Sequence, residues 1–537
     1  MKAQVGAADF ELFRRLVNTL LAVTAIMTSS KAMLSRLRRL FGLQSTERSR
    51  DILKGTTGAA DASDESENGT AEGAASTEPE AADQTRSAPP TRPSRKGHGR
   101  LPSSDYEAAT HVAVPHQELE CGGPCPDCRR GKLYELTEPA RCLRIFGRPM
   151  LEATCWDCQR LRCSSCGSVH TAESPPEAQG PKFDATAVAM IALGRYGMGL
   201  PLSRMAKLQQ HMLLPVPAST QWAVLDENAS AFEPVFAELE RHAAQGEVLH
   251  TDDTHARVLG FMGRRRAKLL QRGELPDPDR TGLFTTGVVS LTHEQPTVLF
   301  YTGRQYAGEN VALLLAARDQ DLAPPTLMSD GLESRNVPAG HAVVESNCLT
   351  HARRGFVDQL TSFPSECRHV IGQLREVYRV EGECLKARLS PDERLATHQR
   401  LAAPIMTDLK VWIETQLGNK RVEPNSDLGK AYKYVLKRWD RLTLFLRLPG
   451  VPIDNNLCER VLKMAIRHRR NSLFYRSERG AEVGDMFMSL IHTAELRREN
   501  PFEYLTAILQ NDKAAAQHPA DWLPWTYRAT LARLEPS

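Results

Sequence analysis

The sequence predicts a multidomain protein of mixed α and β structure, in the α/β or α+β class, and three observations lead to that class. Strand-like segments with one helix among them crowd into residues 246–348. Helical periodicity dominates the regions on either side, at 173–245 and 349–450. Two cysteine clusters occupy residues 121–166. We therefore expect a layered core with a large helical insertion, preceded by a small metal-dependent module and helical segments.

The length of the chain and its charge bear on the number of domains and the class of partner. The chain of 537 residues is long enough for roughly three or four domains, and its 41% hydrophobic content supplies ample core. The net charge of +3 excludes no class of partner by itself. One late segment, "ERVLKMAIRHRRN", carries five cationic side chains against one acid, which is a local pattern that attracts phosphates.

The amino-terminal residues 1–53 read as a helical segment. Its apolar run from Leu16 to Met27 is shorter than the ~20 residues that a bilayer requires, so we expect an amphipathic or partner-binding helix and no membrane association. The order of residues does not fit a signal peptide, which favours a cytoplasmic location. Residues 54–108 are rich in small and polar residues and predict a disordered linker.

Residues 109–172 predict a zinc-ribbon-like module. Two CxxC pairs can supply four thiolates for one structural Zn²⁺ in a segment with little core of its own: Cys125, Cys128, Cys163 and Cys166. The alternative is a set of four reduced, buried cysteines. Three further cysteines, Cys121, Cys155 and Cys158, leave the choice of ligands open.

The rest of the chain follows in five parts. Residues 173–245 predict short helices, which suit DNA binding, although ordinary helical packing is the more frequent explanation for such a set. Residues 246–348 give three strands, a helix and two more strands. A helical insertion follows at 349–450, then a helix-bearing segment at 451–500 and a carboxy-terminal helical tail at 501–537.

Three acids stand out against this background. In an extended strand Asp252 and Asp253 face opposite sides, so only one of them can enter a given site. Asp330 ends a short apolar strand and could equally be a turn aspartate before glycine. Glu459 lies on the late cationic helix, where it could simply pair with Lys463.

Taken together the three acids suggest one site. Carboxylates on a first strand, a fourth strand and a late helix can hold two Mg²⁺ (or Mn²⁺) ions about 3.5–4 Å apart and clamp a phosphodiester. That is the ribonuclease-H-like arrangement. A helical stretch between the last strands and the acidic helix is how the larger DNA transposases are laid out.

At the level of whole motifs the chain resembles transposases of the insertion-sequence-66 family. The resemblance runs from Lys96 to the "NPFEYLTAIL" that starts at Asn500. Its blocks are "LRCSSCG", "GLPLSRMAKLQQ", "ASTQW", "LHTDDTHARV", "LMSDGLESRNVP", "CLTHARRGFVD", "VEPNSDLGKAYKY" and "PIDNNLCERVLKMAIRHRRNSLFYRSERGA". By this resemblance Asp252, Asp330 and Glu459 are the catalytic, Mg²⁺-binding acids of a DDE-type enzyme.

The resemblance implies a transposase that cuts the ends of its element and joins the 3′-hydroxyl ends to target DNA. Its partners would be the terminal inverted repeats, the target DNA, further copies of the chain and small accessory proteins. Expected contacts to phosphate come from seven side chains, whose alternative is ordinary helix-surface charge: Lys463, Arg467, Arg469, Arg470, His351, Arg353 and Arg354. Two other functions stay open, a catalytically silent DNA-binding protein and a hydrolytic nuclease of the same fold.

Overall fold

The computed structural model describes residues 148–534 except 163, 165, 167, 168, 276, 294, 332–336 and 339, and scattered positions between 113 and 136. The expected amino-terminal helix and linker, 1–53 and 54–108, lie outside the described residues. Residues 60–149 belong to a compact unit of their own. The elements described below all lie in the other unit, at 150–534.

Short helices precede the sheet, as the periodicity of 173–245 predicts. Asp184 begins the first of them by accepting a hydrogen bond from the Ala187 amide at 2.8 Å, which satisfies a free N–H of the first turn. That helix ends in a π-helical turn, Leu193–Gly197. The helices are α3 (Ala185–Ala192), α4 (Leu202–His211), α5 (Ala218–Glu227) and α6 (Glu233–Ala244).

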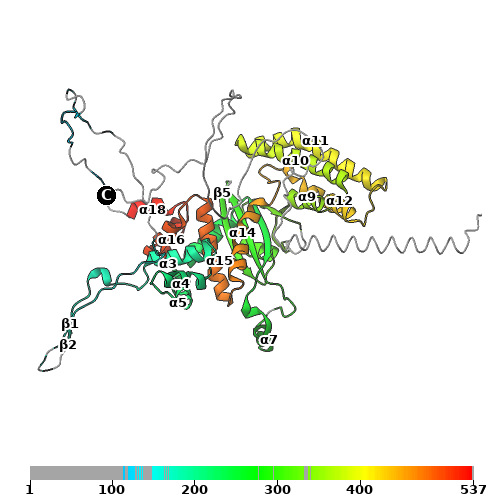
Figure 1. Cartoon of the computed structure of the whole chain (residues 1–537). Coiled ribbons are helices and arrows are strands. Elements are labelled where there is room, and N and C mark those ends of the chain that lie inside the picture. Colours follow the sequence, from blue (N-terminus) through cyan, green and yellow to red (C-terminus); the bar gives the residue numbers. More distant parts are fainter. Residues whose placement is uncertain are drawn as a thin grey trace, which may run out of the picture. The chain divides into compact units, whose positions relative to one another are not determined.

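A five-stranded sheet forms the centre of the unit (Figure 1). Its spatial order is β5-β4-β3-β6-β7; β3, β4 and β5 pair antiparallel, whereas β3, β6 and β7 pair parallel. The strands are β3 (Val248–His255), β4 (Phe284–Thr292), β5 (Gln295–Gly303), β6 (Thr326–Ser329) and β7 (Val344–Asn347). Helix α8 (Ala307–Leu315) connects β5 to β6. These five strands and helix α8 occur in the segments of 246–348 where the sequence pattern predicts them.

The connection between β3 and β4 contains a helix that the sequence analysis did not predict. Helix α7 (Gly263–Gln271) has no buried residue and carries Arg264, Arg265, Arg266 and Lys268. Its apolar residues are few, Ala267, Leu269 and Leu270, and the helix is too short to show a helical period of its own. Figure 1 shows it extending from one end of the sheet.

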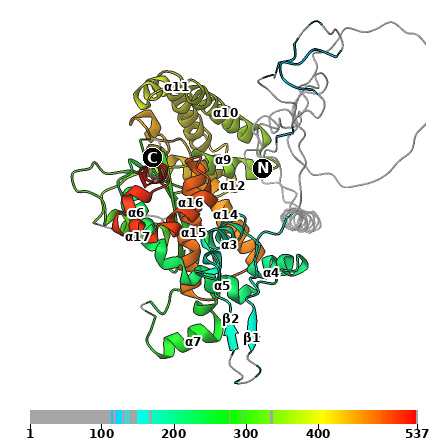
Figure 2. The same ribbon diagram turned by 90° about the vertical axis from the view of Figure 1, so that its left-hand side faces the viewer.

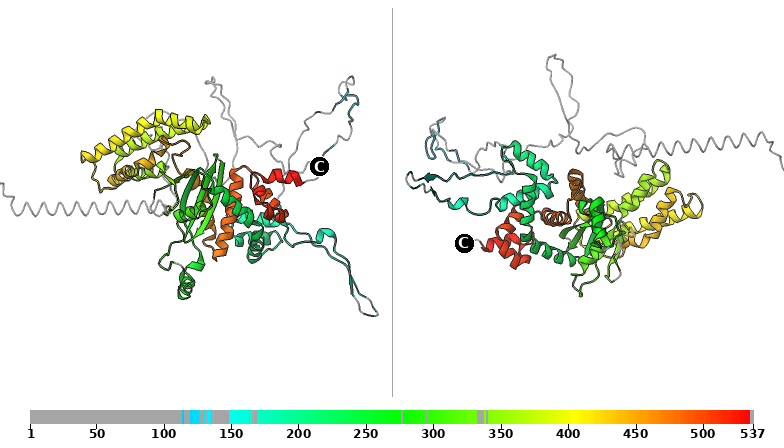
Figure 3. Two further views of the ribbon diagram at one scale, coloured as in Figure 1. Left: turned by 180° about the vertical axis from the view of Figure 1, so that it is seen from behind. Right: turned by 90° about the horizontal axis from the view of Figure 1, so that it is seen from below.

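The region 349–450 is helical, as expected, and it has a core of its own. Ser390 and Glu393 form a capping box at the start of the longest helix. Figures 2 and 3 show α10 and α11 as two long helices that lie side by side. The helices are α9 (Leu349–Asp358), α10 (Pro364–Lys386), α11 (Pro391–Gly418), α12 (Asp427–Lys437) and α13 (Trp439–Leu442).

The carboxy-terminal helices return to the sheet and complete its core. Side chains of α14 approach Gly287 of β4, whereas the neighbouring Thr286 bonds to Asn310 of α8. Because adjacent residues of a strand face opposite sides, α14 and α8 cover opposite faces of the sheet. The helices are α14 (Asn456–Ser472), α15 (Glu478–Leu496), α16 (Pro501–Gln510), α17 (Asp512–Gln517) and α18 (Tyr527–Leu534).

Helix α15 covers the outer edge of the sheet. Thr493 Oγ1, Ser489 Oγ and an Asp485 carboxylate oxygen accept hydrogen bonds from the amides of Val298, Phe300 and Thr302 of β5. The acceptors are four residues apart along the helix, a rise of about 6 Å, and the donor amides are two residues apart along the strand, a rise of about 6.7 Å. Helix and strand therefore stay in step over this length. The helix thereby satisfies amides that an edge strand would otherwise expose.

Asp485 makes this edge contact sensitive to pH. Burial raises the pKa of Asp485 to about 7 from 3.8, although hydrogen bonds from Thr302 act in the opposite direction. Between these two values the folded protein holds a proton that the unfolded chain has lost, so the free energy of unfolding falls as the pH rises from about 4 to about 7.

We therefore expect Asp485→Asn to lose this part of the pH dependence. Between pH 4.5 and 7.5 the free energy of unfolding of the variant should gain about 3 kcal/mol relative to that of the parent chain. Urea unfolding across this pH range measures the difference, with the exposed Asp427→Asn as control. Parallel pH profiles for the parent and the Asp485 variant would contradict the assignment.

Candidate catalytic and metal-binding site

Two of the three acids lie at the same end of adjacent parallel strands. His250 of β3 pairs with Met328 of β6, and two further residues along both strands bring Asp252 level with Asp330. Asp330 follows directly after β6 and is buried. Carboxylates at the ends of neighbouring parallel strands meet at one edge of the sheet. Asp252 and Asp330 are therefore neighbours although 78 positions separate them in the sequence.

The third acid is brought to this edge by α14. Asn455, which precedes the helix, is fully buried and fixes its start against β3. Its amide nitrogen Nδ2 donates to the Thr251 carbonyl at 2.9 Å, and its Oδ1 lies 3.1 Å from His250 Nδ1. Burial lowers the pKa of His250 to about 4, so this ring is neutral near pH 7 and can donate from Nδ1. Glu459 follows one helical turn later, its N–H bonded to the Asn455 carbonyl at 3.1 Å.

The helix also packs tightly on β4. The Cys458 thiol donates to the carbonyl of Gly287 at 3.3 Å. A Cβ atom at Gly287 would lie only 3.0 Å from the Leu462 side chain, so the close approach of α14 to the sheet requires glycine there. These contacts leave little freedom for the first turns of the helix. They hold Glu459 beside the face of β3 on which His250 and Asp252 lie.

The electrostatics of Glu459 show that it belongs to this group. Burial raises its pKa, the positive charges of His351 and Arg354 lower it, and the negative charges of Asp252 and Asp454 raise it. Glu459 Oε1 lies 3.6 Å from His351 Nδ1 and accepts no hydrogen bond within the described residues. A partly buried carboxylate oxygen of this kind is suited to a cation.

The Asp253 side chain forms hydrogen bonds away from Asp252 and Asp330. Its carboxylate accepts hydrogen bonds from Thr286 Oγ1 at 2.6 Å and from the backbone amide of Ala307 at 3.1 Å. Ala307 is the first residue of α8, so Asp253 links β3 to β4 and to the start of that helix. Its side chain lies on the face opposite Asp252, as the alternation of the strand predicts.

The helical insertion holds the turn that carries Asp330. Tyr434 Oη of α12 donates to the Asp330 carbonyl at 2.7 Å, and Arg438 Nη2 donates to the Gly331 carbonyl at 2.9 Å. Gly331 has a φ of +79°, and a Cβ atom there would lie 2.9 Å from Arg438 Nε. The position therefore requires glycine for both conformation and space. The insertion fixes the backbone of one acid of the site.

The predicted cationic residues do not all lie in one place. His351 and the exposed Arg354 lie beside Glu459, whereas Arg353 is buried. Lys463 lines an open cleft of about 550 Å³ together with Glu459 and Arg460 of α14 and residues of α10. The other predicted contacts lie two to three helical turns beyond Glu459 on α14: Arg467, Arg469 and Arg470.

Arg469 differs from its neighbours because its guanidinium is partly committed to the protein. It donates to Thr254 Oγ1 at 3.0 Å and to the His255 carbonyl. Burial and the nearby charges of Arg470 and Arg257 lower its pKa. Arg467 and Arg470 are exposed.

Asn455, Cys348 and α7 are the parts of this region that sequence reasoning missed. Cys348 Sγ accepts the Asn455 amide at 3.2 Å and, with His351 and Glu459, forms one of the two groups of candidate metal-binding atoms among the described residues. Asn455 and Cys348 stand in the blocks "DNN" and "CLTHARR", but a buried neutral side chain leaves no pattern in a sequence. The run of arginines at 264–266 was a signal for α7.

Of the four predicted zinc ligands, Cys128 and Cys163 lie outside the described residues. Cys125 directly follows Pro124, which forms an antiparallel bridge with Lys132. Cys166 lies in the connection between β1 (Arg160–Arg162) and β2 (Val169–Thr171), an antiparallel hairpin. Of the additional cysteines, Cys121 and Cys155 are exposed and Cys158 is half-buried. The zinc site stays a prediction.

The donor atoms at the sheet edge suit a hard divalent cation. Asp252, Asp330 and Glu459 offer carboxylate oxygens, the ligand type that Mg²⁺ and Mn²⁺ prefer. The available oxygen of Glu459, and the negative charge of Asp252 that raises its pKa after the larger effect of burial, agree with this donor set. The residues present therefore fit such an ion.

The sheet is mixed, two acids lie level on adjacent strands, and the cationic helices α7 and α14 belong to the same unit. Residues 181–483 match the family model described as "Transposase IS66 family". The match covers more than half of the chain, so the chain belongs to this family. Membership implies that it acts on DNA.

The similar proteins come from Sinorhizobium fredii. "Uncharacterized protein y4hP" is 26% identical over 492 residues, which cover 86% of this chain and 83% of that protein. "Uncharacterized protein y4jD" is 28% identical over 379 residues, which cover 69% of this chain and 71% of that protein.

Proposed function

We propose that the chain is a divalent-metal-dependent DNA transposase of the DDE type. It would cut the ends of its element and join the freed 3′-hydroxyl ends to target DNA. The observation that carries the proposal is the placement of Asp252 and Asp330 at the same level of adjacent parallel strands, with Glu459 of α14 close enough to Asp252 for that negative charge to raise its pKa. The order β5-β4-β3-β6-β7 with its mixed strand directions supports a ribonuclease-H-like core.

The three acids would hold two Mg²⁺ or Mn²⁺ ions, which when bound supply stabilisation of the charge on the attacking and leaving oxygens of the phosphodiester. The chain itself positions the reacting groups. Asn455 and Gly287 fix the approach of Glu459, while Tyr434 and Arg438 fix that of Asp330. His351 and Arg354 place positive charge beside the site, where the scissile phosphate would lie.

No covalent intermediate with the protein is part of this proposal. A water molecule would attack the phosphodiester first, and the 3′-hydroxyl that cleavage releases would attack the target strand next. In each step one P–O bond forms as another breaks, and the proton of the attacking oxygen passes to solvent. Phosphate contacts by Lys463, Arg467 and Arg470 on the exposed side of α14 would hold the DNA.

A strand-transfer assay separates this function from its alternatives. The assay uses duplexes that carry the terminal inverted repeats, read from the DNA that flanks the coding sequence, and a supercoiled target plasmid in Mg²⁺ or Mn²⁺. A transposase is expected to yield cut ends and joined products. Cleavage without joining would indicate a hydrolytic nuclease of the same fold, and binding without cleavage a silent DNA-binding protein.

The proposal includes a zinc-ribbon-like module at 109–172 with Cys125, Cys128, Cys163 and Cys166 as ligands. The spacing of the two CxxC pairs in the sequence supports it, because such pairs supply the four thiolates of a structural zinc site. We also propose that several copies assemble on the DNA, in the cytoplasm, with small accessory proteins of the element. Among the described residues no helix is both long and apolar enough to span a bilayer.

Purified, reduced protein is expected to contain about one zinc per chain. Cys125→Ser or Cys166→Ser should release the metal and make the 121–166 segment sensitive to protease, because metal binding supplies its folding energy. Metal analysis and limited proteolysis measure both effects, with Cys367→Ser, a buried cysteine of α10 outside both candidate metal-binding groups, as control. Zinc-free protein with a protected segment would refute the module.

A further inference from the structure

Helix α14 ends in a strained turn. Leu473 has a φ of 69° and a ψ of −42°, and the amide of Phe474 donates to the carbonyl of Ser472 at 2.8 Å. This i to i+2 hydrogen bond closes a γ-turn with positive φ, a rare conformation that costs free energy in any residue other than glycine. A non-glycine residue persists there only because the surrounding structure holds it.

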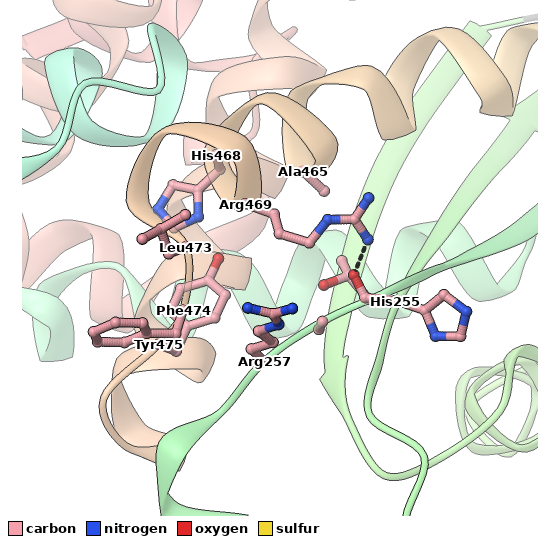
Figure 4. A pocket seen from close by; sticks show the side chains of 10 residues that line it. His255, Arg257, Ala465, His468, Arg469, Leu473, Phe474 and Tyr475 are labelled. Carbon is pink, nitrogen blue, oxygen red and sulfur yellow. Dashed lines mark hydrogen bonds between the residues drawn. The ribbon is translucent and has the colours of Figure 1, made fainter. Parts of the chain in front are cut away.

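The turn presents two apolar side chains to solvent among arginines. Leu473 is 56% exposed and Phe474 is 42% exposed. Arg257, Arg469 and Phe474 line the same small pocket in Figure 4, and Arg470 and Arg476 are exposed nearby in sequence. Within the part of the chain that the structure describes, no ion pair joins any of these four arginines to a carboxylate. The surface is therefore apolar at its centre and positively charged around it.

A rigid support lies beneath the turn. The backbone of Tyr475 bonds to that of Arg257 at 2.8 Å and to that of Leu259 at 2.9 Å. The Tyr475 ring stacks on His468, with ring centroids 4.9 Å apart. The stack continues through Tyr196 to Phe487, with centroid distances of 6.0 and 5.5 Å. These buried rings keep Leu473 and Phe474 from folding back into the core.

Helix α7 extends the positive surface on one side. Arg265 Nη1 of α7 donates to the carbonyl of Arg476 at 3.3 Å, so the helix lies beside the segment that follows the turn. Its other cations, Arg264, Arg266 and Lys268, add to the charge of the same region. Contacts of arginine and lysine with phosphates supply most of the sequence-independent affinity for DNA.

We propose that Leu473 and Phe474 form an apolar wedge that enters the base stack of duplex DNA, while the surrounding arginines hold the phosphates on either side. Apolar side chains flanked by cations unstack base steps in many architectural DNA-binding proteins. A second copy of this chain is a poorer occupant, because two such faces would bring their arginines together.

The position of the wedge follows from helix geometry. Fourteen residues of α14 separate Leu473 from Glu459, a rise of about 21 Å along the helix axis. At 3.4 Å per base pair, this corresponds to about six base pairs of B-form DNA. The inference rests on the proposed function, since it places the unstacked step about six base pairs from the phosphate that the three acids would cut.

The test uses end duplexes with the fluorescent base 2-aminopurine placed singly at positions three to ten base pairs from the cleaved phosphate. With the full-length parent chain we expect a fluorescence rise, the sign of unstacking, centred near position six. Phe474→Ala should lower that rise and the cleavage rate roughly tenfold, the effect of losing one base–aromatic stack. Phe474→Trp should restore both.

Two further variants separate the wedge from a structural role. Leu473→Gly removes the cost of the positive φ, so its melting temperature should stay the same or rise while the fluorescence signal falls. A merely structural role predicts no loss of signal in that variant. Leu313→Ala, which changes an exposed leucine on α8 at the other face of the sheet, is the matched control and should leave the signal and cleavage unchanged.

The outcomes distinguish the inference from the function on which it rests. A parent chain that neither binds nor cuts the end duplexes would overturn both. Normal cutting with no fluorescence rise, or with an equal rise in Phe474→Ala, would overturn the wedge alone. If Phe474→Ala instead lowers the molar mass of the DNA-free protein in light scattering, the surface is an interface between copies and the wedge is wrong.

Discussion

Replacing Asp252 with asparagine is expected to abolish DNA cleavage and strand transfer while DNA binding persists. The rates should fall by roughly 10³-fold or more, because about 4 kcal/mol of transition-state stabilisation is lost when a neutral amide replaces a carboxylate between divalent ions. Asp330→Asn and Glu459→Gln should have the same effect. Double variants should be no worse than single ones, since the three acids act as one unit.

Asp253→Asn is the matched control because it changes the next residue of the same strand. Its amide oxygen can still accept the bond from Thr286 or from Ala307, so we expect a loss of about 1 kcal/mol in stability and cleavage close to that of the parent chain. Cleavage and binding are measured side by side in Mg²⁺ and Mn²⁺. If the Asp253 variant is inactive and the Asp252 variant active, Asp253 is the metal ligand and our assignment is wrong. If Glu459→Gln keeps full activity, Glu459 is an ordinary ion-pairing residue.

Asn455→Ala is expected to have the second largest effect. The change leaves the buried Thr251 carbonyl and His250 Nδ1 without their partner, which should lower the free energy of unfolding by about 2–4 kcal/mol. It also releases the start of α14, so cleavage should fall even at temperatures where the variant is fully folded. Asn455→Asp keeps the size of the side chain but cannot donate to Thr251, and it should be similarly impaired.

Asn456→Ala provides the control for this prediction. Asn456 is exposed, and its side chain bonds only to Asp454 in the described contacts. Urea unfolding and cleavage by the folded fraction should both remain near the values of the parent chain. If Asn455→Ala and Asn456→Ala behave alike, the buried bonds of Asn455 do not position Glu459.

The sheet could be predicted because its strands carry a local signal. Runs of β-branched, aromatic and other apolar residues mark β4 and β5, and the alternation of side chains along a strand places Asp252 and Asp253 of β3 on opposite sides. Local patterns also predict the helical insertion and α14. Asp454, an acid just before α14, accepts the Asn456 amide at 3.0 Å.

The supports of the site could not be predicted in the same way. The bond between His250 and Asn455 joins residues 205 positions apart, and both side chains are neutral and buried. Tyr434 and Arg438 act on Asp330 and Gly331 across more than 100 positions. Such contacts depend on tertiary packing, which no local period encodes. Helix α7 was missed for a different reason, because it is short and none of its residues is fully buried.

The two separate hydrophobic cores give the site an unusual dependence. Asp252 and Glu459 rest on the core of the sheet, whereas the turn of Asp330 is tied to the insertion, whose side chains pack among themselves. The spacing between the carboxylates therefore depends on the packing of both cores. Substitutions that loosen the core of the insertion are expected to lower cleavage while the sheet stays folded.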